Sequence, residues 1–234
     1  MPTALLDLVL PPRCAGCGAP GALVCPRCTA ELHGEPACRT PAPPPPGLPE
    51  CWSATGYTGA VRRMIIAYKE RGRTALARPL AGALALTIAA GADERPVTLV
   101  PVPSARPALR RRGHDPVTGL AELAAGCLRA AGRPATVAKL LVPRRRIADQ
   151  AGLSSLQRVE NLALAYKVAT AWNGPQAAFW GDAERVVLVD DIVTTGATLA
   201  EAARALREAG VAASLAVTVA ATRRRGRTGI RDGG

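Results

Sequence analysis

The chain has 234 residues, of which 48% are apolar and only 3% are aromatic. This length holds one medium-sized α/β domain with a small appendage, and the core must consist mostly of Ala, Val and Leu. The net charge of +12 favours polyanionic partners. No apolar run reaches the about 18 residues of a membrane span, and residues 1–10 contain Asp7 and no basic residue, unlike a secretory signal. We therefore expect a cytoplasmic protein without a membrane span.

Two C-x-x-C pairs follow a short amphipathic helix predicted over residues 1–10. Cys14 and Cys17 form the first pair, and Cys25 and Cys28 form the second. Each C-x-x-C turn places two thiolates on one face, so the two turns supply the four soft ligands of a closed zinc site. Disulfides, a redox pair and chance spacing are the alternatives, and disulfides would need an oxidising compartment. We name these four residues the cysteine cluster and predict that it holds a structural Zn²⁺.

A proline-rich stretch at residues 41–49 follows and is expected to be an extended, semi-rigid spacer. Apolar residues then alternate between helical spacing and short strand-like runs, which predicts a parallel sheet with helices on both faces. Cys127 is expected in the core, on the apolar face of a helix. The predicted helices lie around residues 61–68, 80–88 and 117–128, and the predicted strands lie at residues 98–102, 137–142, 186–189 and 214–220.

The segment that starts at Val186 is the most informative part of the sequence. Four consecutive apolar residues predict a buried parallel strand, which ends at two adjacent carboxylates, Asp190 and Asp191. A loop follows, and then a helix with Glu201 in its first turn and Gly210 as its stop signal. Free backbone N–H groups and the helix dipole attract an anion to such a loop. The residues expected at this anion site are Thr194, Thr195, Gly196, Ala197 and Thr198.

Two carboxylates directly after a buried strand repel each other and are costly to bury. We name Asp190 and Asp191 the acid pair, and residues 194–198 the Thr-Gly loop. An ordinary strand, polar turn and helix is the structural alternative. The segment resembles the 5-phosphoribosyl 1-pyrophosphate (PRPP) motif of type I phosphoribosyltransferases. The resemblance implies that the acid pair binds the ribose 2′- and 3′-hydroxyls and that the Thr-Gly loop binds the 5′-phosphate.

Lys69 lies at the end of a predicted helix, before a Glu-Arg-Gly-Arg turn. In the type I fold, a loop at the corresponding place binds pyrophosphate through backbone N–H groups and a basic side chain. The resemblance therefore implies that Lys69 binds PRPP. The alternative is a surface lysine whose charge is favourable at the end of a helix.

The cysteine cluster followed by a phosphoribosyltransferase-like domain is similar to the ComF family of competence-associated proteins. Further matching segments include Tyr57-Thr58-Gly59 and Val100-Pro101-Val102-Pro103, whereas His114-Asp115-Pro116 departs from the family pattern. The resemblance assigns no role to that last loop. It implies the α/β type I phosphoribosyltransferase fold, with a parallel sheet flanked by helices and a small zinc-binding module. The expected divisions are residues 1–52 (zinc-binding module with proline-rich linker), 53–222 (phosphoribosyltransferase domain) and 223–234 (basic tail).

Arginine runs at residues 110–112, 144–146 and 223–225 are either a solvated face or binding surfaces for PRPP and nucleic acid. Residues 148–168 lack a clear period and are a candidate for the flexible catalytic loop of the type I fold. The only two histidines, His33 and His114, lie in no Cys or Asp cluster, so neither is expected to be a catalytic base.

Two hypotheses on function follow, with the acceptor and the oligomeric state left open. In the first, the chain is an enzyme that displaces pyrophosphate from C1 of PRPP. The acid pair would then orient the ribose and stabilise its developing positive charge, and Mg²⁺ would accompany the pyrophosphate. In the second, it is a non-catalytic PRPP sensor or scaffold of DNA uptake that binds single-stranded DNA or a helicase partner. The intact PRPP motif favours the first hypothesis, and the positive charge and the family resemblance favour the second.

Overall fold

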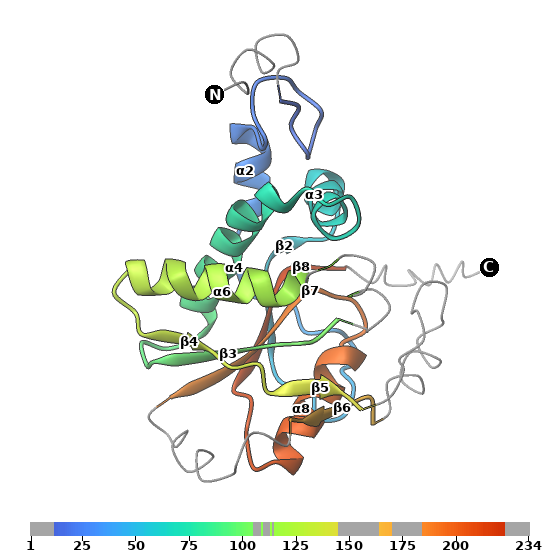
Figure 1. Cartoon of the computed structure of the whole chain (residues 1–234), viewed down its shortest axis with the longest axis vertical. Coiled ribbons are helices and arrows are strands. Elements are labelled where there is room, and N and C mark those ends of the chain that lie inside the picture. The colour runs from blue at the N-terminus through green and yellow to red at the C-terminus, as the bar shows by residue number, and fades with distance from the viewer. Residues whose placement is uncertain are drawn as a thin grey trace, which may run out of the picture.

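The computed structural model describes residues 12–104, 109, 113, 115–144, 164–169 and 184–222. Within them, helices flank a central sheet, and a small two-stranded sheet lies beside it (Figure 1). The helices are α2 (Pro26–His33), α3 (Gly59–Glu70), α4 (Ala77–Gly91), α6 (Pro116–Ala130) and α8 (Ala197–Glu208), with a 3-10 turn η1 (Thr74–Leu76). The strands are β1 (Ala37–Cys38), β2 (Cys51–Gly56), β3 (Val97–Pro101), β4 (Ala135–Val137), β5 (Leu141–Pro143), β6 (Tyr166–Val168), β7 (Arg185–Val193) and β8 (Leu215–Ala221).

The central sheet has the strand order β1-β2-β8-β7-β3-β4. Its neighbouring strands are parallel except for β1 and β2, and β5 and β6 form the separate antiparallel pair. The carboxyl ends of the parallel strands therefore meet at one edge, where open α/β sheets bind their ligands. This topology confirms the predicted α/β fold with a mostly parallel sheet between helices.

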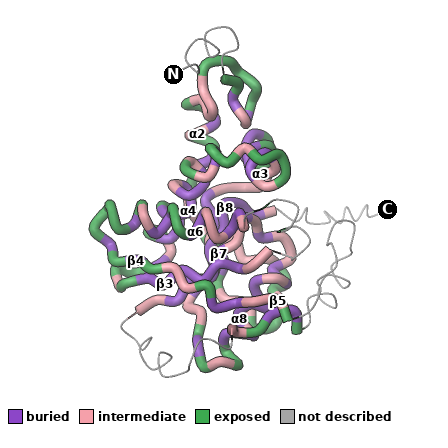
Figure 2. The backbone as a smooth tube through the Cα atoms, in the orientation of Figure 1, coloured by how far each residue is buried: buried purple, intermediate pink, exposed green. Residues whose placement is uncertain are grey.

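Both faces of the sheet are buried, which explains the unbroken apolar run of β7. Val187 and Val189 belong to a core that is shared with α3, α4 and α6. Val186 and Leu188 point to the other face and belong to a core that is shared with α8, β5 and β6. Alternate strand residues face opposite sides, so one strand supplies both cores. Figure 2 shows the buried tube segments in the middle of the molecule and the exposed ones around it.

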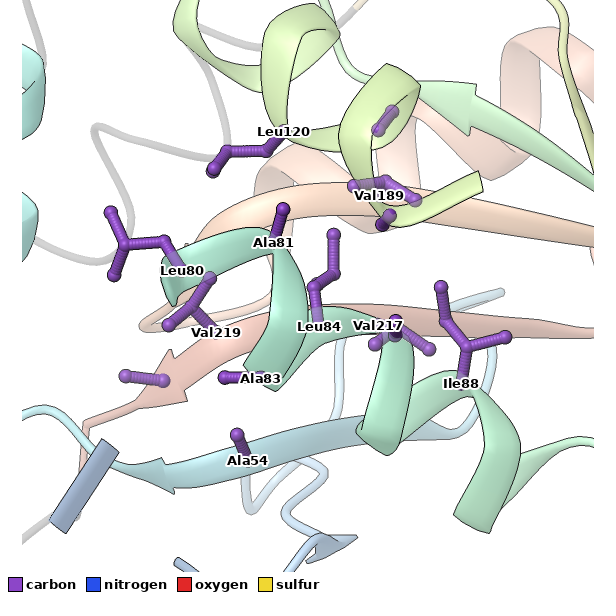
Figure 3. Close-up of a cluster of buried hydrophobic side chains, with 14 of the residues drawn as sticks. Ala54, Leu80, Ala81, Ala83, Leu84, Ile88, Leu120, Val189, Val217 and Val219 are labelled. Carbon is purple, nitrogen blue, oxygen red and sulfur yellow. The ribbon is translucent and has the colours of Figure 1, made fainter. Parts of the chain in front are cut away.

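Helix α4 provides much of the first core. Leu80, Leu84 and Ile88 are fully buried and lie over β8 and β7, close to Val217 and Val189 (Figure 3). The segment Thr74–Gly91 is also the one stretch among the described residues that is long and apolar enough to cross a membrane. The sequence reading overlooked it, because no unbroken apolar run reaches that length. In the structure, its apolar face packs against the sheet, as in a core helix.

The structure confirms α3, α4 and α6 at the positions given by helical spacing, and β3 and β8 lie within one residue of the predicted strands. Cys127, however, is exposed on α6, so its placement in the core was wrong. At about 100° per residue, Cys127 lies about 60° around the helix from Ala124, beyond the buried Leu120. It lies toward the edge of the buried stripe and in the last turn of α6, where Arg129 and Ala130 are also exposed.

The proline-rich stretch lies against the domain. Arg207 Nη1 of α8 donates to the carbonyl oxygen of Gly47 at 3.0 Å, and Leu48 packs on the core between the sheet and α8. The predicted division at residues 52 and 53 falls inside β2, which pairs with β8 in the central sheet. The division into modules stays a prediction. The predicted N-terminal helix at residues 1–10 and the tail at residues 223–234 lie outside the described residues.

Candidate functional site

The acid pair lies near the carboxyl end of β7. The strand continues to Val193 instead of ending before Asp190, because its ladder with β8 extends past the acid pair. The chain then turns at Gly196, whose φ of 78° lies in the left-handed region that favours glycine, and α8 begins at Ala197. The Thr-Gly loop is therefore a strand-to-helix turn at the ligand-binding edge of the sheet.

The Thr-Gly loop has the groups that an anion needs. The first turn of a helix has backbone N–H groups without helical partners, and the helix dipole adds positive potential there. Thr195 Oγ1 accepts a hydrogen bond from Ala197 N at 3.3 Å, which holds the turn onto α8. Thr194, Thr195 and Thr198 are all half-buried, so their hydroxyls remain partly accessible. This arrangement is suited to a phosphate group.

Asp191 forms an ion pair with Lys69, which comes from the last turn of α3. The distance between Lys69 Nζ and Asp191 Oδ2 is 2.5 Å, and the Asp191 side chain is only 3% exposed. Asp191 Oδ1 accepts a hydrogen bond from Ile192 N at 2.9 Å. The structure therefore brings together two residues that the sequence reading nominated separately. Their roles in binding PRPP stay predictions.

Asp190 points to the other face of β7, toward the core that contains β6. Its Oδ1 atom accepts a hydrogen bond from Asp191 N at 2.8 Å. Loss of hydration and the neighbouring Asp191 carboxylate raise the pKa of Asp190 well above its ordinary value, and Lys69 offsets only part of this rise. Asp190 therefore resists ionisation unless a hydroxyl donor or a further cation stabilises its charge.

Two tyrosines lie on opposite sides of the acid pair, and the sequence reading missed both. Burial and the charges of Asp115 and Asp191 raise the pKa of Tyr68 to about 12, and its hydroxyl donates to the carbonyl oxygen of Pro116 at 2.9 Å. Burial, followed by the charge of Asp190, also raises the pKa of Tyr166 in β6. In the sequence, Tyr68 is only one member of a helical face, and Tyr166 lies in a stretch without a clear period.

Glu201 lies at a different place in its helix from the predicted one. It lies beyond the first turn of α8 and is buried. Its carboxylate accepts from Tyr166 N at 3.3 Å and pairs with Arg204, whose Nη2 also donates to the carbonyl oxygen of Tyr166. Glu201 therefore fixes β6 onto α8.

Asp115, in the loop to which the resemblance assigned no role, is the N-cap of α6. Its carboxylate accepts from Val117 N at 3.2 Å and from the hydroxyls of Ser104 and Thr118. Such a cap stabilises a helix by about 1 kcal/mol. The cap also orients the Pro116 carbonyl group that Tyr68 binds.

The cysteine cluster brings all four sulfur atoms to within 4.8 Å of one another. None of the seven cysteines, all of which are described, is in a disulfide. Zn–S bonds of about 2.3 Å in a tetrahedron separate the sulfur atoms by about 3.8 Å, and the Cys17 and Cys25 sulfur atoms are 3.6 Å apart. The spacing and the soft donors therefore fit Zn²⁺.

The backbone favours the thiolate form of Cys14, whereas burial and the neighbouring cysteines raise the pKa of Cys28. Burial alone would raise the pKa of Cys14, but backbone N–H groups of Cys17, Cys25 and Gly16 lower it to about 6. Of these, the N–H of Cys25 lies 3.4 Å from Cys14 Sγ. Thiolate is the form that binds metal, so this turn is prepared for a cation. A bound Zn²⁺ would link the two C-x-x-C turns and stabilise their fold.

Some predicted features lie outside the described residues. These are residues 145–160, which include most of the second arginine run and most of the predicted catalytic loop, together with the other two arginine runs and His114. Arg144 is described and exposed. His33, near the end of α2, lies apart from the acid pair and takes part in no described cysteine or aspartate cluster.

Residues 150–232 match the family model of the phosphoribosyl transferase domain. The matched range contains β6, β7, the Thr-Gly loop, α8 and β8, and therefore the whole acid pair. No curated protein matches the chain. The match supports a phosphoribosyltransferase-like function that involves PRPP. Together with the cysteine cluster near the N-terminus, it supports two parts of the ComF resemblance, whereas membership of that family stays a prediction.

Proposed function

We propose that the chain binds PRPP with Mg²⁺ at the acid pair and the Thr-Gly loop, and transfers the phosphoribosyl group to an acceptor with release of pyrophosphate. The contact between Lys69 and Asp191 is the observation that carries this proposal. It supplies a cation beside the acid pair, at the same sheet edge as the helix N-terminus. The three parts of PRPP each need one of these groups. The helix N-terminus suits the 5′-phosphate, the acid pair suits the ribose hydroxyls, and the cation suits the pyrophosphate.

Each of these groups has a distinct part in the proposed reaction. The N–H groups and hydroxyls of the Thr-Gly loop hold the 5′-phosphate, and the acid pair accepts hydrogen bonds from the two ribose hydroxyls. Positive charge develops on the ribose ring as the bond from C1 to pyrophosphate breaks, and the nearby carboxylates stabilise that charge. Lys69 neutralises the departing pyrophosphate. Mg²⁺ would supply further charge neutralisation at the pyrophosphate oxygens.

The raised pKa of Asp190 supports this use of the acid pair. In the free protein, ionised Asp190 is partly shielded from water and lies beside another carboxylate, which makes it a costly charge. A ribose hydroxyl donates a hydrogen bond to it, and a cationic transition state offsets its charge. The acid pair therefore interacts more strongly with the transition state, in which the ribose ring is positively charged, than with bound PRPP. Catalysis requires this difference.

Calorimetric titration with PRPP in excess Mg²⁺ tests the binding half of the proposal. Lys69→Gln removes the cation and should weaken binding about tenfold, as expected for one charge-assisted contact of about 1.5 kcal/mol. Lys139→Gln is the matched control, because Lys139 forms a surface ion pair with Glu122 at 2.8 Å and both side chains are mostly exposed. Equal affinities of the two variants for PRPP would show that Lys69 does not contribute to its binding.

Release of pyrophosphate tests the enzymatic half. Wild-type protein with Mg²⁺ and PRPP should release pyrophosphate faster when the correct nitrogenous acceptor is present in a panel of bases, amides and ammonia. Replacement of both residues of the acid pair by asparagine should abolish that acceleration. Tight binding of PRPP without release for any acceptor would instead favour a sensor.

The positive charge supports a second candidate, a non-catalytic PRPP sensor or scaffold that binds single-stranded DNA during DNA uptake. Binding through arginine runs without interleaved aromatics has little stacking and should therefore be largely electrostatic. The affinity for a single-stranded oligonucleotide should fall steeply between about 50 and 200 mM salt. Salt-insensitive binding or a strong base preference would contradict this description. For either candidate we place the protein in the cytoplasm, where thiols stay reduced.

A further inference from the structure

Helix α3 contacts the cysteine cluster at one end and the acid pair at the other. At its N-terminal end, Arg63 Nε donates a hydrogen bond to the carbonyl oxygen of Gly16, which lies between two cysteines of the cluster. A Cβ atom at Gly16 would lie 2.7 Å from Cys28 Sγ and 3.0 Å from Ala60 Cβ. The first C-x-x-C turn is therefore packed directly on α3, with no room for a side chain.

Buried residues continue this contact. Cys14, Cys28 and Leu32 belong to the same core as Val61 and Met64 of α3. Just beyond α3, Arg73 Nη2 donates to the carbonyl oxygen of Arg13 at 3.1 Å. The turns of the cluster thus cover one side of α3 near its N-terminal end and contact the chain just after its C-terminal end.

The C-terminal end of α3 carries Tyr68 and Lys69. Tyr68 binds the Pro116 carbonyl oxygen, and Lys69 pairs with Asp191 at 2.5 Å. Ala60 and Lys69 are nine residues apart, so about 14 Å of helix separates the two contacts. A helix of this length moves as a rigid element, and a shift at one end displaces the other.

We propose that docking of the metal-loaded cysteine cluster onto α3, through Arg63 and Gly16, positions Lys69 at the acid pair and thereby strengthens the binding of PRPP. This inference rests on the proposed function. It makes Arg63 a positioning residue, since it contacts the cluster and not the ligand site. It also makes metal at the cluster and PRPP at the acid pair mutually favourable ligands.

The physical basis is a two-state contact. Zn²⁺ would join the two C-x-x-C turns and so hold in place the surface, formed by Gly16 and Cys28, that covers Ala60. Without it, α3 loses the apolar cover that Cys14, Cys28 and Leu32 provide near its N-terminal end, and Lys69 at its C-terminal end is held less firmly. Two ligands that both favour the docked state must strengthen each other by the same factor.

The test uses the full-length chain and three arginine variants. Arg63→Gln removes the donor to Gly16 and should weaken Mg-PRPP binding about fivefold while the zinc content stays at that of wild type. Arg63→Lys retains a donor and should restore most of the affinity. Arg62→Gln is the matched control, because Arg62 is the exposed neighbour on α3 and makes the same change of charge. Its affinity should match that of wild type.

Two further measurements separate positioning from general stability. Hydrogen exchange at residues 66–71 should be faster in Arg63→Gln and in wild-type protein stripped of zinc than in loaded wild type. Mg-PRPP should also slow the transfer of zinc to a chromogenic chelator in wild type, and this effect should disappear in Arg63→Gln. A purely structural role would change the melting temperature but leave the effect of PRPP on zinc transfer intact.

The outcomes also distinguish this inference from the proposed function. If wild type does not bind PRPP, the proposed function fails, and exchange at residues 66–71 still decides whether the cluster holds α3. If wild type binds PRPP but Arg63→Gln binds it as tightly as Arg62→Gln does, with unchanged exchange, the coupling is refuted and the proposed function stands.

Discussion

Gly196 of the Thr-Gly loop and Gly210 after α8 have the same backbone conformation and different surroundings. Both have a φ of 78°. A Cβ atom at Gly196 would lie 2.7 Å from Leu48 Cδ2 of the proline-rich stretch, whereas a Cβ atom at Gly210 would have nothing within 4 Å. Replacement by alanine therefore imposes the same left-handed conformation at both positions, and a steric clash at Gly196 alone.

The magnitudes follow from these two effects. A left-handed alanine costs about 1–2 kcal/mol, and overpacking costs about 1–3 kcal/mol more. Gly210→Ala should therefore lower the free energy of unfolding by about 1–2 kcal/mol, and Gly196→Ala by about 2–5 kcal/mol. Urea unfolding of the two variants measures this difference. Calorimetry should also show weaker Mg-PRPP binding for Gly196→Ala alone.

Leu48→Ala supplies the control. In a chain with Leu48→Ala, the cost of Gly196→Ala should fall to that of Gly210→Ala, so the double-mutant cycle should give a coupling of about 1–3 kcal/mol between residues 48 and 196. Equal losses for the two glycine variants, with no coupling to Leu48, would refute the close approach of the proline-rich stretch to the Thr-Gly loop.

Two further predictions concern the acid pair and the cysteine cluster. The pKa of Asp190 is raised in the folded chain, so its ionisation costs stability as the pH rises above the ordinary pKa of aspartic acid. Asp190→Asn should therefore stabilise the free protein against urea at neutral pH, but not at a pH below the ordinary pKa of aspartic acid. Equal changes in stability at the two pH values would contradict a raised pKa of Asp190. Removal of Zn²⁺ by a chelator should expose the four thiols of the cluster to a thiol reagent and unfold α2, whereas the exposed Cys38 and Cys127 should react before and after. Purified protein that contains no zinc, and whose four cluster thiols react as readily as Cys38 and Cys127, would show that the cluster holds no metal.

The sequence was sufficient where a local pattern determines the structure. The apolar run of β7 predicted a strand buried on both faces, and the structure has one core on each side of it. Gly210 was predicted to stop α8, and the helix ends at Glu208 with Gly210 in the left-handed conformation. The C-x-x-C spacing predicted a cluster of four sulfur atoms, which the structure contains. Each of these features depends on neighbours within a few residues.

The sequence was insufficient where distant segments meet. The pairing of Lys69 with Asp191 depends on how α3 packs on the sheet, and local spacing gives no information on that packing. The contact of Glu201 with β6 likewise depends on how α8 packs, and the position of Glu201 along the helix gives no sign of it. The proline-rich stretch was expected to be a spacer because proline favours extended chains, yet Leu48 finds an apolar surface beside Gly196.

Titration of Mg-PRPP into wild-type protein and into the double variant Asp190→Asn/Asp191→Asn tests the central claim most directly. The substitutions keep the shape of both side chains and remove their charge, so two charge-assisted hydrogen bonds to the ribose are weakened. Wild type should bind PRPP in the presence of Mg²⁺, and the double variant should bind about 100-fold more weakly, a difference of about 3 kcal/mol. Equal affinity in the two proteins, or no binding by wild type, would contradict the assignment of this site.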